Sequence, residues 1–168
     1  ASKSADADKV EEELSTLHVE DLEKKATTIF PKENGIPFIY DYMIRGYFKE
    51  VCGSLRKLST SRSAKLTSYK KVIDGLVFVE PRKILITMPE GGVIGYCQRP
   101  LRGQTAQGER ISLAMSETIP ADSTIEFQVM LLDDGMEKTI KEWMDYGVLK
   151  GLGQWRNSGK GKFKYEII

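Results

Sequence analysis

The chain has few of the residues on which enzymes and secreted scaffolds depend. It holds two cysteines, Cys52 and Cys97, and one histidine, His18, among 168 residues. Two cysteines outside any CxxC pair make neither a disulfide framework nor a structural zinc site, and they fit a reducing cytoplasm. A lone histidine in an acidic stretch cannot build a histidine-rich metal centre, and it indicates a surface or packing role.

Long apolar runs are also missing. None approaches the roughly 18–20 residues of a membrane span, and the first residues lack the apolar core of a secretory signal. Hydrophobic residues make up 40% of the chain and charged residues 29%, which is typical of a folded domain with its own core. We therefore expect a single cytoplasmic domain, 1–168, with no membrane partner and no cofactor.

A net charge of +1 hides an uneven distribution. Residues 41–71 carry eight bases against two acids, and residues 148–168 carry five bases against one acid. Acids dominate residues 1–34 and 117–146. If the two basic blocks meet, they form a face that attracts phosphate backbones. The alternative is ordinary solvated surface.

Apolar residues that recur every three or four positions predict helices over 8–25, 38–58 and 135–146. Gly46 in the second helix indicates either a close backbone neighbour or a later helix start. The third helix begins at a cap, Asp133 or Asp134, and Gly147 predicts a left-handed stop.

Alternating patterns predict strands through the middle of the chain and at its C-terminal end. We expect strands over 76–79, 83–87, 93–101, 111–115, 125–131 and 163–167. Corners or turns are expected at 32–35, 80–82 and Gly91–Gly92, a short extended piece at 27–30, and a flexible loop at 59–64.

Residues 147–164 combine glycines, cations and one tryptophan. Two Gly-x-Gly pairs, Gly151/Gly153 and Gly159/Gly161, bracket Trp155. Glycine lets a backbone approach a ligand closely, Lys and Arg contact phosphates, and Trp offers a stacking platform. These are the parts needed to hold single-stranded nucleic acid. The pattern is neither a GxxxxGK[ST] phosphate loop nor a dinucleotide fingerprint, because a helix precedes it and a strand follows. The alternative is a glycine-rich turn with the tryptophan in the core.

A helix, two Gly-x-Gly pairs around a basic stretch, and a closing strand together resemble the RAMP superfamily, the RNA-binding proteins of CRISPR effector complexes. The stretch 36–46 is similar to the family's "IPGSSLKG" helix start, with Ile36, Pro37, Arg45 and Gly46 matching in type. The stretch 116–127 is similar to its "VPAGTxFEF" strand entry. The middle of the chain is unmatched, which fits a standalone phage or mobile-element member.

The resemblance implies an α+β, ferredoxin-like fold similar to an RNA recognition motif. An antiparallel sheet would carry helices on one face, with 1–35 as a peripheral acidic extension and 70–116 as inserted strands. The family opens with a strand before its first helix. Either 27–30 serves as that strand, or it lies before Ala1. In the second case an open sheet edge would accept a second copy or a protein partner.

The resemblance also implies non-catalytic binding of single-stranded RNA. Family endonucleases use a histidine, but His18 does not match their position, and Asp6 and Asp8 do not align with the family's cleaving aspartate. No catalytic or metal-binding residue is therefore carried over. The expected RNA-binding residues are Arg45, Lys49, Arg56, Lys57, Gly151, Gly153, Trp155, Arg156, Asn157, Gly159, Lys160, Gly161, Lys162 and Lys164.

Two alternatives from other classes remain open. The chain could be a protein-interaction module that mimics or blocks a CRISPR effector subunit, with its acidic blocks docked on a basic partner. It could also be a metal-dependent nuclease, because Asp133, Asp134 and Glu137 form the tightest acidic cluster near a strand end.

Overall fold

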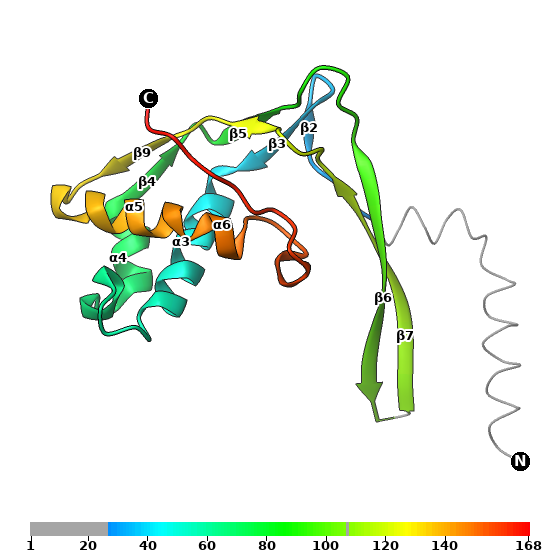
Figure 1. The fold of residues 1–168 in the computed structure, drawn as a ribbon, viewed down its shortest axis with the longest axis horizontal. Helices are drawn as coiled ribbons and strands as arrows, with labels where there is room; N and C mark the ends of the chain where they lie inside the picture. The colour runs from blue at the N-terminus through cyan, green and yellow to red at the C-terminus, as the bar shows by residue number, and fades with distance from the viewer. Residues whose placement is uncertain (1–26, 107) are drawn as a thin grey trace, which may run out of the picture. The chain divides into compact units, whose positions relative to one another are not determined.

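The computed structural model describes residues 27–106 and 108–168, and the helix expected over 8–25 lies outside them. Helices and strands combine in an α+β fold, as expected (Figure 1). None of the helices in the described ranges has both the length and the apolar character that a bilayer span requires.

The chain divides into two compact units. The first takes in the residues up to Pro31 together with Thr87–Thr124, and the second takes in Lys32–Ile86 together with Ile125–Ile168. Every residue expected to bind RNA belongs to the second unit.

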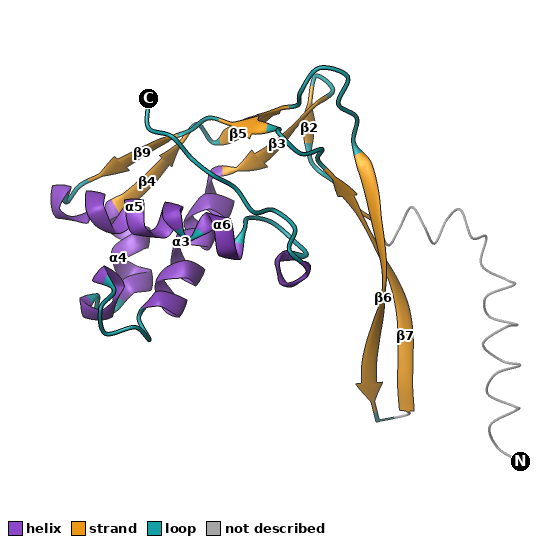
Figure 2. Cartoon of the chain, in the orientation of Figure 1, coloured by secondary structure: helices purple, strands orange, loops and turns teal. Residues whose placement is uncertain are grey.

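The first unit is built on a long antiparallel hairpin of β6 (Gly95–Thr105) and β7 (Gly108–Thr118) (Figure 2). A short strand, β1 (Thr27–Thr28), pairs with β7 in parallel. Just beyond it, the Phe30 N–H donates to the Glu117 carboxylate at 2.8 Å. The extended piece expected at 27–30 is thus confirmed over its first two residues.

The strands expected over 93–101 and 111–115 are present. The first begins two residues later than expected, at Gly95, and ends later, while the second extends past both expected ends. The turn at Gly91–Gly92 is also confirmed. The Gly92 N–H donates to the carbonyl of Pro89 at 2.8 Å, and Gly91 adopts a φ of +71°.

The second unit opens with a tight hairpin of β2 (Lys32–Glu33) and β3 (Ile36–Tyr40). Its turn is Asn34–Gly35, where both residues have positive φ, as a hairpin turn of this kind requires. On its other side β3 pairs antiparallel with β5 (Lys83–Thr87), which places Phe38 opposite Leu85.

The helix expected over 38–58 begins later and ends earlier, as α3 (Asp41–Leu55). Residues 37–39 are buried in β3, where pairing with β5 overrides the helical periodicity that the following residues share. The expectation was wrong at its start. Gly46 lies inside α3, and a Cβ there would meet nothing within 4 Å, so it marks neither a close backbone neighbour nor the start of the helix. A strand thus does precede the first helix of the second unit, and it lies within 36–40.

The helix α4 (Tyr69–Leu76) was not expected. Its last residue, Leu76, was expected to begin the strand over 76–79. In the structure Ile73 is fully buried and the strand β4 begins only at Val77.

A second pair of strands joins β4 (Val77–Glu80) to β9 (Gln128–Leu131), antiparallel, with Phe78 opposite Met130. The expected corner at 80–82 separates β4 from β5 and is confirmed. The strand expected over 125–131 is divided, since β8 (Thr124–Ile125) lies in the four-stranded sheet of order β2-β3-β5-β8. This order does not show the ferredoxin-like arrangement.

Helices cover one face of the β4–β9 pair (Figure 1). Val77 on β4 is fully buried beneath α3 and α4. Phe48 of α3 meets Trp143 of α5 (Glu137–Asp145), with the two rings 5.6 Å apart, and both side chains are fully buried, as is Val51 of α3. This apolar cluster fixes α3 relative to α5, and α5 leads toward the glycine-rich segment.

The loop expected to be flexible at 59–64 is instead fixed to α5. It contains the 3-10 turn η1 (Arg62–Lys65) and a fully buried Ser63. The Ser63 Oγ accepts from Trp143 Nε1 at 2.7 Å, while Glu142 accepts from the Arg62 N–H at 3.1 Å. Its polar, small composition resembles a solvated loop, but partners about 80 residues away satisfy those groups.

The end of the chain also differs from the expectation. Gly147 does not stop α5. It begins a further turn, α6 (Gly147–Lys150), and the left-handed residue is Gly151, with a φ of +76°. The strand expected over 163–167 is not formed, because these residues run extended without joining a sheet.

Candidate nucleic-acid interface

The glycine-rich segment folds into a closed loop between α6 and the C-terminal stretch. The Leu152 N–H donates to the carbonyl of Gly161 at 2.8 Å and joins the two ends of the loop. A Cβ on Gly151 would lie 2.7 Å from the carbonyl oxygen of Lys160, and one on Gly161 would overlap the carbonyl of Leu152. Both glycines also have positive φ, so the closure requires glycine at both positions.

The loop is anchored to α3 by one carboxylate. Glu50 pairs with Lys150 Nζ at 2.8 Å through one oxygen and with Arg156 through the other. Burial alone would raise the pKa of Glu50, but the hydrogen bond from Lys150 and the charge of Arg156 outweigh it and hold that pKa below its ordinary value. Arg156 therefore holds the loop in place, and part of its charge is neutralised.

Trp155 is half-buried and does not belong to the fully buried core. Its backbone lies in the left-handed region, with a φ of +58°, ahead of the 3-10 turn η3 (Arg156–Ser158). Its carbonyl accepts from the backbone and hydroxyl of Ser158, both at 3.0 Å. This tight turn leaves Asn157 exposed at the tip of the loop.

Three lysines extend from the loop along the C-terminal stretch, and all are exposed: Lys160, Lys162 and Lys164. We call them the lysine row. Phe163 and Tyr165, which alternate with Lys162 and Lys164 along the chain, point inward. The Phe163 ring lies 5.4 Å from that of Tyr47 and against Gly147, and the Tyr165 hydroxyl reaches the Lys141 carbonyl at 3.5 Å. The alternation predicted for a strand is thus present without the strand.

The cations expected on α3 have different surroundings. Arg45 pairs with Asp41 at 3.3 Å, and Lys49 pairs with Asp74 of α4 at 2.5 Å. These two contribute to the packing of the unit. Arg56 and Lys57, just beyond the helix, are exposed. The structure therefore joins the glycine loop to α3 through Glu50. Of the cations expected to bind RNA, the exposed ones are those of the lysine row and the two that follow α3.

The acidic cluster has structural partners. Asp133 accepts from the Gly135 N–H at 2.9 Å as the cap of η2 (Asp134–Met136), which confirms the expected capping role. Glu137 pairs with Lys141 at 2.6 Å. Across the described residues, no three or more His, Cys, Asp or Glu side chains are grouped so that they could hold a metal ion.

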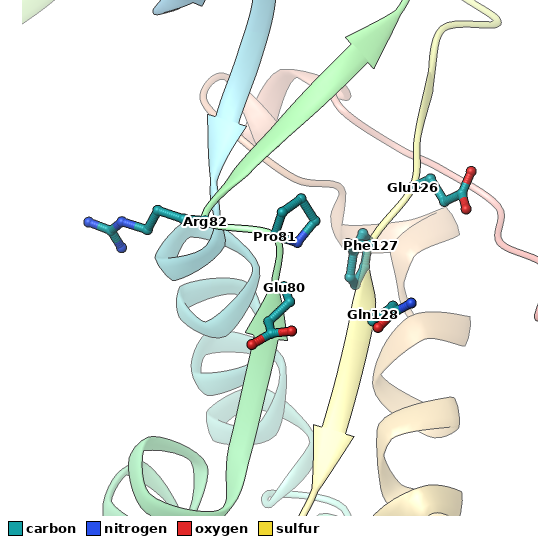
Figure 3. A pocket seen from close by; sticks show the side chains of 6 residues that line it. All are labelled: Glu80, Pro81, Arg82, Glu126, Phe127 and Gln128. Carbon is teal, nitrogen blue, oxygen red and sulfur yellow. The ribbon is translucent and has the colours of Figure 1, made fainter.

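A cavity of about 530 Å³ lies between the corner that joins β4 to β5 and the residues that join β8 to β9 (Figure 3). Pro81 and Phe127 face it, with Glu80 and Gln128 side by side, while Arg82 and Glu126 point away. Arg82 is held outside by its ion pair with Asp41. The lining side chains do not converge on a reactive centre, so we assign the cavity no chemistry.

Sequence reasoning missed Glu50 and the Ser63–Glu142–Trp143 network. Glu50 is one of only two acids in the basic block 41–71, and its isolation among cations was a usable signal. The network had no comparable signal, because its members lie about 80 residues apart.

Compared with known proteins, the chain matches no family model and no curated sequence.

Proposed function

We propose that this protein binds single-stranded RNA without cleaving it, through the glycine loop and the lysine row, in the manner of RAMP proteins. The observation that carries the proposal is the lysine row, three exposed cations beside a loop held rigidly by Glu50. Lysines spaced along an extended backbone suit a strand of phosphates, and a closed glycine loop lets that strand approach closely.

The roles within the site differ. Gly151 and Gly161 close the loop, and Lys150 and Arg156 position it. Lys160, Lys162 and Lys164 contact phosphates. Half-buried Trp155 offers its exposed edge or face to a base, and Asn157 offers an amide for hydrogen bonds.

The RAMP assignment, with its ferredoxin-like sheet, remains part of this proposal. In its favour, β3 leads into α3 and β9 leads into α5, as the family's two strand–helix pairs require. The adjacent, antiparallel pairing of β3 with β5 departs from that arrangement. Within the described residues β9 pairs on one side only, so its other edge could accept a second copy or a partner strand.

Fluorescence anisotropy with labelled single-stranded RNA, single-stranded DNA and duplex, at two salt concentrations, tests the proposal. We expect single-stranded RNA to bind more tightly than single-stranded DNA or duplex, and its affinity to fall as the salt concentration rises. The Trp155→Ala/Arg156→Ala variant should bind less tightly. Absence of RNA binding at low salt would refute the proposal.

A second candidate is the protein-interaction module. One face of the β4–β9 pair exposes opposed apolar side chains, Phe78 (38%) and Met130 (48%), and Leu132 beyond them is 70% exposed. Neighbouring apolar groups in water favour a protein contact. Light scattering over a range of concentrations tests this candidate. A monomer at every concentration and beside every candidate partner would count against it.

A further inference from the structure

A second group of cations follows α3, outside the glycine loop. Between Glu50 and Asp74 the chain has no acid, and within that interval lie six exposed bases. They are Arg56, Lys57, Arg62, Lys65, Lys70 and Lys71. None of the ion pairs seen among the described residues involves any of them. Within the part of the chain that the structure describes, this positive charge therefore has no ion-paired carboxylate.

Three of these bases surround a single pocket. A cavity of about 260 Å³ is lined by Arg56 from the end of α3 and by Ser68, Tyr69, Lys70 and Lys71 at the start of α4. We call it the Tyr69 pocket. Two ammonium groups, one guanidinium, one hydroxyl and one phenol ring are the groups that recognise a phosphate with a base or sugar beside it.

The aromatic wall of the Tyr69 pocket is fixed by its neighbours. The Arg56 guanidinium carbon lies 5.1 Å from the centre of the Tyr69 ring, a cation–π contact. On the other side the Tyr69 hydroxyl fits over Gly53, where a Cβ would lie 2.8 Å from it. A guanidinium stacked on a ring keeps its N–H edges free to donate to phosphate oxygens.

The backbone around the Tyr69 pocket is also fixed by contacts with neighbouring elements. Lys49 on α3 pairs with Asp74 on α4 at 2.5 Å, and Ile73 of α4 is fully buried. The intervening loop is bound to α5 through Glu142 and Ser63. A preorganised basic pocket binds an anion without first ordering its own loop.

We propose that the Tyr69 pocket is a second anchor for the same single-stranded RNA, in which Arg56, Lys70 and Lys71 hold a phosphate group beside the Tyr69 ring. This inference rests on the proposed function. Of the residues it uses, only Arg56 was expected from sequence to bind RNA. The strand would then be held at the lysine row and at the pocket.

Lysine acylation followed by peptide mass spectrometry tests the anchor on the wild-type protein, with and without a single-stranded RNA oligonucleotide. We expect RNA to slow acylation at Lys70 and Lys71, and also at Lys162 and Lys164, but not at Lys138. Protection of the lysine row alone would overturn the second anchor and leave the proposed function intact. Protection at neither group would overturn both.

A charge variant gives an independent measurement. Lys70→Gln/Lys71→Gln should make the slope of log K against log salt shallower by up to about 0.7, because the pocket holds one phosphate and each neutralised phosphate on a single strand contributes about 0.7. The matched variant Lys32→Gln/Lys138→Gln removes the same charge elsewhere in the unit and should keep the wild-type slope. Equal slopes for the two variants would overturn the anchor, and circular dichroism verifies that both are folded.

Discussion

At the scale of single residues, Ser63 is the polar group on which the packing of α5 depends. It is fully buried, and its hydroxyl is the acceptor for the indole N–H of Trp143 at 2.7 Å. Ser63→Ala would leave that buried donor unsatisfied, which costs about 1–3 kcal/mol. Urea unfolding should show a loss of this size, whereas Ser59→Ala, at an exposed position, should leave the unfolding free energy unchanged. Equal stability of the two variants would contradict the network.

Glu50 makes a prediction about pH. Its folded pKa lies below the ordinary value, so the stability that it contributes is present above the unfolded pKa of about 4.3 and is lost as pH falls through the folded pKa. Glu50→Gln should therefore unfold more easily than wild type at pH 7. The difference should shrink as pH falls from about 5 toward 3, because the protonated carboxyl resembles the amide. A difference independent of pH would show that the two ion pairs contribute nothing.

At the scale of elements, the backbone of the glycine loop is closely packed at its base, around Gly161, and has open space near its tip, at Gly159. Gly161→Ala combines positive φ with overlap on the Leu152 carbonyl, whereas Gly159→Ala has positive φ and open space. We expect about 1 kcal/mol of destabilisation for the second and about 3 kcal/mol or more for the first. Thermal and urea unfolding measure both. The order of the two losses is the test, and the reverse order would mean that the loop is not closed at Leu152–Gly161.

Local patterns predicted some elements well and failed on others for a common reason. The turn at 34–35, the cap at Asp133 and the helix that follows are encoded by neighbouring residues, and the structure has them. The strand β3 was taken for helix because its partner, β5, lies about 45 residues away. The loop at 59–64 was taken for flexible because Glu142, which holds it, is about 80 residues away.

The same limit applies to the candidate site. Glycine, lysine and tryptophan in one segment indicated a nucleic-acid loop. They could not show which cations are already paired. Glu50 engages Lys150 and Arg156, while Lys160, Lys162 and Lys164 remain exposed. That distinction depends on tertiary contacts and decides which cations we assign to phosphates.

At the scale of the whole molecule, a nearly neutral chain concentrates its positive charge in one unit. The second unit carries 18 bases against 12 acids, while the described part of the first carries three bases against four acids. Charge of one sign on one unit attracts a polyanion over a distance that falls as salt rises. The account therefore predicts RNA binding that depends on salt and on particular lysines of the second unit.

The most direct test measures RNA affinity by anisotropy across a series of salt concentrations for wild type, Lys162→Gln/Lys164→Gln and Lys32→Gln/Lys138→Gln. Both variants lose two positive charges from the second unit, and only the first loses them from the lysine row. We predict that the slope of log K against log salt falls by about 1.4 in the first variant and stays at the wild-type value in the second. Identical slopes in the two variants would show that the lysine row is not the RNA-binding surface.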